Sequence, residues 1–128
     1  MLRYSQKTGS LFQYSKAEAG WTWETLGKGY SGRGEGLNNP EKEDVADIGP
    51  CPVGIWAISF PFTDTKRGPL CFRLTPLTYK GARRGFLIHG DNTSANHTAS
   101  EGCIILGHEL RQKLADMKAD YLLVEAED

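Results

Sequence analysis

The sequence predicts a mostly β fold with one amphipathic helix near its C-terminus. Glycine and proline divide the first two thirds of the chain into short runs rich in β-branched and aromatic residues, which is typical of strands. After these runs, apolar residues recur once at three- and four-residue steps, which indicates a single helix with one buried face. With 128 residues, 39% of them apolar and 24% charged, the chain is expected to form a single domain over residues 1–128.

The expected strands are the runs whose residues favour pleated, half-buried positions. They are residues 11–14, 21–26, 53–60, 70–77 and 86–89. Thr8-Gly9 has the composition of a hairpin turn. Because side chains alternate along a strand, Trp21 and Trp23 should share one side of theirs. Packing in the core or at an edge is the default for these indoles and for Trp56, with a carbohydrate platform as the alternative.

The expected helix carries its apolar residues on one stripe, which should cover the sheet. These residues are Leu106, Leu110, Leu114 and Met117. Residues 121–124 then predict a last strand, whose short apolar run suits an interior position of the sheet more than an edge. Residues 27–36 contain five glycines and should form a loop or a bulged strand. Residues 31–52 have little apolar content and predict a long surface loop, which is either functional or a tolerated insertion.

Charge and hydropathy exclude several kinds of partner. The 15 basic and 16 acidic residues give a net charge of −1, which provides no general field for phosphates, so nucleic acid is not an expected partner. No run of about 18 apolar residues exists, so a membrane protein is not expected. The first residues lack the apolar stretch of a secretory signal. We therefore expect synthesis in the cytoplasm without a signal peptide.

The three cysteines, Cys51, Cys71 and Cys103, have an odd count and no CxxC spacing. Neither a disulfide framework nor a thiolate zinc site is indicated. Cys71 lies in a strand-like run and is expected to be a small buried apolar side chain.

Residues 86–106 hold the most informative pattern, in which His89 ends one apolar run and Cys103 begins another. A thiol needs a base or a positive neighbour to become a nucleophile, and imidazole is the usual partner. Gly102 would let the backbone approach a substrate, and the amides of Gly102 and Cys103 could face a developing oxyanion. Ser100 could orient the imidazole or the substrate. A Gly-Cys beside an apolar run is equally typical of a buried structural cysteine.

His89-Gly90 followed by Ser100-Glu-Gly-Cys103 resembles the signature of L,D-transpeptidase catalytic domains, in which a histidine precedes Ser/Thr-x-Gly-Cys. Residues 4–9, 29–36, 38–40 and 49–54 resemble the peptidoglycan-targeting L,D-transpeptidase-like effectors that type VI secretion systems export. The resemblance covers most of the chain.

The resemblance implies an L,D-transpeptidase-like β-sandwich or barrel that needs no cofactor. Its substrate would be a peptidoglycan tetrapeptide stem, and Cys103 would form an acyl-enzyme at the bond after meso-diaminopimelate. His89 would carry the proton, and Gly102 and Cys103 would supply oxyanion amides. Release to water would remove the terminal D-alanine, whereas release to a free D-amino acid or a second stem would exchange the residue or form a cross-link. The resemblance also places residues 32–36 as a wall over the cleft.

Two departures from the signature concern substrate recognition. Glu101 stands where a histidine often precedes the Gly-Cys, and Ile105 stands where an arginine often follows it. The carboxylate of the substrate must then be bound elsewhere. The candidate substrate-binding residues are Gly90, Asp91, Arg73, Arg83, Arg84 and Arg111, with Asp91 either holding His89 or binding a substrate amine.

Two alternatives to this enzyme stay open. The chain could be a non-catalytic cell-wall-binding module of a phage or secretion particle, or a zinc-dependent peptidase using His89, Asp91 and His97, with Cys103 as a fourth ligand. The spacing of these residues is not a common zinc pattern. The hypothesis of a cysteine-dependent peptidoglycan enzyme predicts an antibacterial effector, or a phage-encoded wall enzyme, that acts in the periplasm of a target cell after secretion or lysis. An effector of this kind is expected to have a cognate immunity protein.

Overall fold

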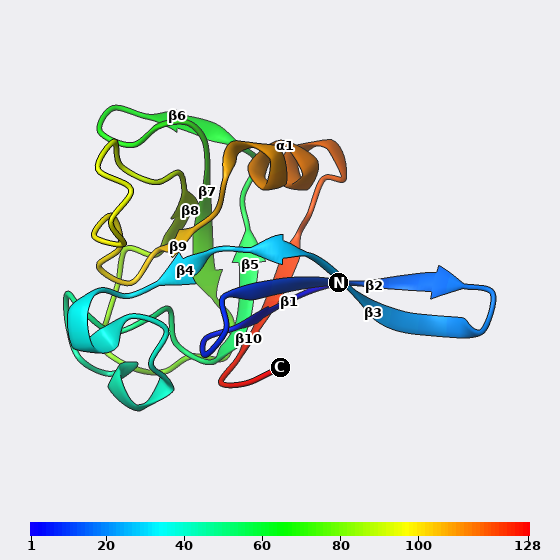
Figure 1. Ribbon diagram of the computed structural model, residues 1–128, viewed down its shortest axis with the longest axis horizontal. Helices are drawn as coiled ribbons and strands as arrows, with labels where there is room; N and C mark the ends of the chain where they lie inside the picture. The colour runs from blue at the N-terminus through cyan, green and yellow to red at the C-terminus, as the bar shows by residue number, and fades with distance from the viewer.

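The computed structural model describes residues 1–128, which contain ten strands, one α-helix and two short 3₁₀ helices (Figure 1). The strands are β1 (Leu2–Ser5), β2 (Ser10–Ala17), β3 (Gly20–Lys28), β4 (Tyr30–Ser31), β5 (Gly54–Ile58), β6 (Phe62–Asp64), β7 (Gly68–Pro76), β8 (Leu87–His89), β9 (Ile104–Ile105) and β10 (Tyr121–Glu125). The helices are η1 (Gly34–Gly36), η2 (Pro40–Lys42) and α1 (His108–Asp116). None of the helices is long and apolar enough to cross a membrane.

The strands follow the order β3-β2-β1-β10-β5-β7-β8-β9-β4, and β6 pairs with β7 off this path. Strands β3 and β4 stand at opposite ends of the order, although Gly29 alone separates them in the chain. The chain therefore joins the two ends of the sheet directly, and the sheet is a nearly closed barrel. The β2–β3 hairpin projects from this body (Figure 1).

Two glycines make the junction between the ends of the sheet possible. The amide of Gly29 donates to the carbonyl of Gly9 over 2.8 Å. A Cβ on Gly29 would overlap the carbonyl oxygen of Ile105, and one on Gly9, whose φ is +73°, would overlap the carbonyl oxygen of Gly29. Only residues without a side chain let these three backbones pass so closely. The contact brings β4 beside β9 and so beside the site described below.

The main core lies between α1 and the sheet. Trp56, Phe72 and Leu122 are almost fully buried, and Leu114 of α1 packs against the same cluster. Leu110 and Met117 cover its edge, as the apolar stripe predicts. The helix begins at His108 and does not include Leu106, because the amide of Leu106 extends the β8–β9 ladder by donating to His89 over 3.1 Å.

The prediction of a mostly β fold with one C-terminal helix is confirmed, and β10 occupies an interior position between β1 and β5. Trp21 and Trp23 both pack against the ring of Tyr14, so they share one side of β3 as predicted. Trp56 belongs to the core, whereas Trp21 is 61% exposed. Strands β1, β4 and β6 were not predicted, because segments of two to four residues carry little periodicity, whereas β9 lies in the apolar run that was expected to begin at Cys103.

The prediction that residues 31–52 form a surface loop was wrong at the ends of the segment. Ser31 and Cys51 are fully buried, and η1 and η2 lie between them. The guanidinium of Arg83 donates to the carbonyls of Glu43, Gly49 and Pro50 over 2.6 to 3.1 Å. These hydrogen bonds satisfy backbone groups and hold the segment against the barrel without a large apolar surface.

Gly29→Ala is expected to lower the free energy of unfolding by about 3 kcal/mol, because the new methyl group must displace the backbone of β9 or β4. Thermal and urea denaturation measure the change. Gly107→Ala is the matched control, since nothing lies within 4 Å of a Cβ at that position. Equal stability of the two variants would contradict the assigned role of Gly29.

Candidate active site

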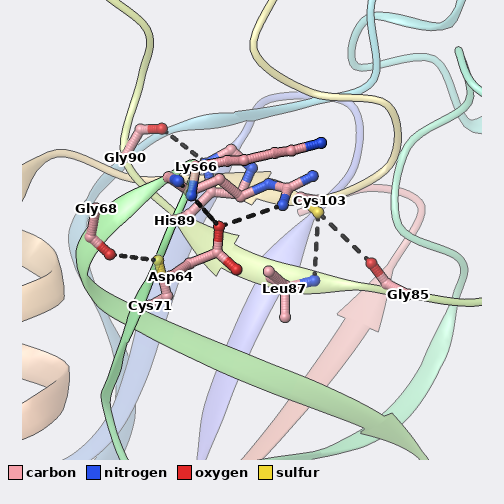
Figure 2. A network of polar contacts seen from close by, with 10 residues as sticks. Asp64, Lys66, Gly68, Cys71, Gly85, Leu87, His89, Gly90 and Cys103 are labelled. Atoms are coloured by element: carbon pink, nitrogen blue, oxygen red, sulfur yellow. Dashed lines mark hydrogen bonds and ion pairs between the residues drawn. The ribbon is translucent and has the colours of Figure 1, made fainter.

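Parallel pairing of β8 and β9 brings His89 and Cys103 to one face of the sheet. Ile88 pairs with Ile104 and His89 with Ile105, so Cys103 stands opposite Leu87. Because side chains alternate, Leu87 and His89 point to one face, and Cys103 and Ile105 point to the same one. The amide of Leu87 donates to the sulfur of Cys103 over 3.3 Å (Figure 2). The predicted pair is therefore held by the strand register.

Both side chains open into one cleft with a volume of about 350 Å³. Its lining is mostly polar and comes from four separate segments. The lining residues are Asp47, Lys66, Arg67, Arg84, Gly85, Phe86, His89, Thr98, Ala99, Glu101, Gly102 and Cys103. Asp47 belongs to segment 31–52, so this segment does form part of the wall, although residues 32–36 do not.

Cys103 is 7% exposed, and its sulfur lies 3.8 Å from the carbonyl of Gly85. Burial raises the pKa of the Cys103 thiol, and Glu101 and Cys71 raise it further. The amide of Leu87 and the charge of Arg67 act in the opposite direction without cancelling the effect. The resting sulfur is therefore a thiol at neutral pH, and it needs a base when it reacts.

His89 is 3% exposed, and its Nδ1 lies 2.8 Å from the carbonyl oxygen of Gly90 (Figure 2). A carbonyl only accepts, so this contact assigns the proton to Nδ1 and leaves the lone pair on Nε2. Burial is the largest effect on the pKa of His89 and lowers it, and the charges of Arg67 and Arg111 lower it further. The hydrogen bond to Gly90 and the charge of Asp64 raise this pKa without cancelling the decrease. The imidazole is therefore neutral at pH 7 and able to accept a proton.

Ser100 does not reach the imidazole, contrary to one of its two predicted roles. Its hydroxyl donates to the carbonyl of Cys103 over 2.6 Å and accepts from the amides of Gly32 and Gly102 over 2.8 and 3.1 Å. The amide of Gly102 is thus occupied by Ser100, which corrects its predicted role as an oxyanion donor. Ser100 is fully buried and shapes the turn before the cysteine.

Ser31, which the sequence did not single out, supports the same turn from β4. Its hydroxyl donates to the carbonyls of Gly102 and Cys103 over 3.2 and 3.0 Å and accepts from the amide of Cys51 over 2.8 Å. The side chain is fully buried. The only indication of this role in the sequence is that Ser31 lies in segment 29–36, which resembles the effectors. The contacts with Gly102 and Cys103 join residues about 70 positions apart, so no local pattern predicts them.

The predicted arginines have different roles. Arg111 donates to the carbonyls of Leu106, Pro69 and Leu70 and is buried, so its guanidinium is used within the fold. Arg83 also donates to the carbonyl of Glu101 over 2.9 Å and ties segment 31–52 to the cysteine turn. Arg73 lies over the ring of Phe62, outside the cleft. Of the four predicted arginines only Arg84 lines the cleft, which corrects the substrate-binding assignments of Arg73, Arg83 and Arg111.

Gly90 and Asp91 follow His89 directly. The carbonyl of Gly90 holds the imidazole, and a Cβ there would crowd the guanidinium of Arg111. Asp91 does not bond to His89 and accepts instead from the hydroxyl of Tyr30 over 2.7 Å. The same hydroxyl accepts from the amide of Ala99 over 3.2 Å, so Tyr30 ties the two ends of loop 91–99 together.

Lys66 and Arg67 are cleft residues that sequence reasoning missed. Both lie in the turn between β6 and β7, where the carboxylate of Asp64 accepts from their amides over 2.9 Å (Figure 2). Asp followed by basic residues and Gly68 is a turn signal. This local pattern does not predict that the turn faces His89, because the pairing of β7 with β8 is what brings the turn to the cleft.

The residues of the zinc alternative do not gather into a site. His97 lies edge-on to the ring of Tyr30, with 4.9 Å between the centroids. Asp91 bonds to Tyr30 and Asn92. No group of three or more His, Cys, Asp or Glu side chains has an arrangement that could hold a metal ion.

The nearly closed β-sheet, with His89 at the end of β8 and Cys103 directly before the parallel strand β9, is that of the L,D-transpeptidase-like class of domains. The chain belongs to the Tlde1 domain family within that class, since the family model matches residues 26–122. The suspected relationship to type VI secretion L,D-transpeptidase effectors is thereby confirmed. No curated protein matches the chain in sequence.

Two solved structures share the fold. The helical cell shape determining protein Pgp2 from Campylobacter jejuni superimposes with a TM-score of 0.66 at 19% identity, over 99% of this chain and 47% of that one. Bd1075 from Bdellovibrio bacteriovorus gives a TM-score of 0.61 at 16% identity, over 99% of this chain and 48% of that one. The chain thus spans about half the length of these proteins.

Ser100→Ala is expected to lower the free energy of unfolding by about 2 kcal/mol, because it leaves the buried amides of Gly32 and Gly102 without an acceptor. Urea denaturation measures the loss. Ser94→Ala, an exposed serine of the same segment, should change stability little. If both variants unfold at the same urea concentration, the stabilising role assigned to the Ser100 hydroxyl is wrong.

Alkylation of Cys103 by iodoacetamide is expected to accelerate with rising pH, with a midpoint above the value of about 8.5 for an exposed cysteine. The reason is that burial raises the pKa of the thiol, so the reactive thiolate appears only at higher pH. Mass spectrometry of the peptide that carries Cys103 separates its reaction from that of Cys51 and Cys71. A midpoint below 8 would indicate a preformed thiolate.

Proposed function

We propose that the protein is a cysteine-dependent L,D-carboxypeptidase and D-amino-acid-exchanging acyltransferase acting on peptidoglycan tetrapeptide stems. The bond attacked would be the one between meso-diaminopimelate and the terminal D-alanine. The observation that carries the proposal is that the buried thiol of Cys103 and the buried imidazole of His89 line one cleft. Membership of the Tlde1 domain family supports a peptidoglycan-related activity for this pair.

Acylation begins with proton transfer from Cys103 to Nε2 of His89 as the sulfur attacks the carbonyl carbon of the stem. The backbone amide of Cys103 supplies a hydrogen bond to the developing oxyanion. The imidazolium then gives its proton to the leaving amine of D-alanine, and the C–N bond breaks. The hydrogen bond from Nδ1 to Gly90 keeps the ring in the orientation that this transfer needs.

Deacylation reuses the same base. Neutral His89 takes a proton from water or from an incoming amine as its oxygen or nitrogen attacks the thioester carbonyl. The C–S bond then breaks, and the imidazolium returns the proton to the sulfur of Cys103. Water yields the shortened stem, and a free D-amino acid yields an exchanged stem. The absence of arginine at position 105 leaves carboxylate recognition to other cleft cations, Lys66, Arg67 and Arg84.

The proposed setting is the periplasm of a bacterial target cell, reached through a type VI secretion system, with phage-mediated lysis as the second route. Family membership supports the first route. An enzyme that trims wall peptides would also harm the cell that makes it. We therefore include a cognate immunity protein in the proposal as a partner of the cleft.

Cys103→Ala is expected to abolish release of D-alanine from disaccharide tetrapeptides, because Cys103 is the only thiol that lines the cleft with His89. Mass spectrometry of the products, with and without added D-amino acid, measures hydrolysis and exchange together. Cys71→Ser is the matched control, since Cys71 is buried outside the cleft and should leave turnover within about twofold.

The outcomes separate the alternatives. Equal turnover by wild type and Cys103→Ala would refute the cysteine mechanism and favour a metal-dependent peptidase, for which chelation would then abolish activity. Binding to sacculi without turnover by either protein would favour a wall-binding module. Loss of turnover in Cys103→Ala alone would establish the nucleophile.

A further inference from the structure

A second cleft of about 260 Å³ adjoins the first and shares His89 with it. Lys66, Arg67, His89 and Ala99 line both clefts. The second is completed by Gly90, Asp91 and Asn92, and Cys103 is not among its residues. His89 therefore borders both the cleft that holds Cys103 and a smaller cleft that does not.

Positive charge on one side of the second cleft comes from the β6–β7 turn. The guanidinium of Arg67 has one ion pair, in which Nη1 lies 3.5 Å from the carboxylate of Asp64, and its side chain is 40% exposed. The other guanidinium donors stay free for a ligand. Hydrogen bonds from the amides of Lys66 and Arg67 to the carboxylate of Asp64 fix the turn, so both residues line the cleft together with His89.

Negative charge in the same cleft comes from Asp91. Its Oδ1 accepts from the hydroxyl of Tyr30 over 2.7 Å and from the amide of Asn92 over 2.9 Å. Both hydrogen bonds end on one oxygen, so Oδ2 stays available to a donor from a ligand. Tyr30 is buried and holds this carboxylate in place.

We propose that the second cleft binds the zwitterion of a free α-amino acid. Arg67, with Lys66 beside it, takes the α-carboxylate through charge-assisted hydrogen bonds, and Asp91 takes the ammonium group. The cleft then holds D-alanine as it leaves and the D-amino acid that replaces it. The inference rests on the proposed function for the chemistry that follows binding, but not for binding itself.

The exchange step balances in atoms and protons. His89 takes one proton from the bound ammonium, and the resulting amine attacks the carbonyl carbon of the Cys103 thioester. The C–N bond forms and the C–S bond breaks, and the second proton lost by nitrogen passes to the sulfur. His89 then releases its proton to solvent. A ligand held by both charged ends presents its nitrogen to the one base that both clefts share.

Titrations of the full chain with D-alanine, D-alaninamide and D-lactate, followed by saturation-transfer NMR, test the inference without requiring turnover. D-Alaninamide lacks the carboxylate and D-lactate lacks the ammonium. Wild type is expected to bind D-alanine about tenfold more tightly than either analogue. Arg67→Gln should remove the preference over D-alaninamide, and Asp91→Asn should remove the preference over D-lactate.

Arg67→Lys should retain part of the preference for the carboxylate, and Lys113→Gln, which removes a charge from the exposed face of α1, should retain all of it. Circular dichroism verifies that each variant is folded. Equal affinity of wild type for the three ligands, or an unchanged preference in Arg67→Gln, would overturn the inference even if Cys103 still trims tetrapeptides. Selective binding of D-alanine without any turnover of tetrapeptides would support the amino-acid site and refute the proposed function.

Discussion

The close passage of three backbones at Gly9, Gly29 and Ile105 is the constraint on which the rest of the structure depends. It joins the two ends of the strand order, so that β4 pairs with β9 although β3 and β4 are neighbours in the chain. A side chain on either glycine would separate these strands. Without that pairing, Ser31 could not lie beneath the turn that presents Cys103.

Buried polar side chains that bind backbone groups hold the site together. Ser31, Ser100 and Arg83 connect β4, segment 31–52 and the cysteine turn through hydrogen bonds to amides and carbonyls. Each side chain supplies a buried backbone group with the hydrogen bond that water would otherwise make. Leaving such a group without a partner costs more free energy than the hydrogen bond itself contributes to stability. These hydrogen bonds hold loops of low apolar content against the barrel and so position the residues of the cleft.

Burial and local charge together determine the chemistry of the cleft. Burial raises the pKa of Cys103 and lowers the pKa of His89, which favours the uncharged forms that the proposed proton transfer requires. Lys66 and Arg67 concentrate positive charge beside this pair in a chain whose net charge is −1. A local field of this kind selects an anionic ligand end, which the total charge does not predict.

The sequence by itself determined the longer strands, the single helix, the interior position of β10 and the candidate pair of Cys103 and His89. The strands and the helix follow from periodicity and from local turn chemistry, which act over a few residues, whereas the pair follows from the resemblance of its motifs to the L,D-transpeptidase signature. Only the tertiary structure decided that Arg83 and Arg111 bind carbonyls of the chain, that Ser100 occupies the amide of Gly102, and that Lys66 and Arg67 face His89. Those contacts join segments far apart in the chain through strand register, and no local pattern encodes which distant backbone a polar side chain will meet.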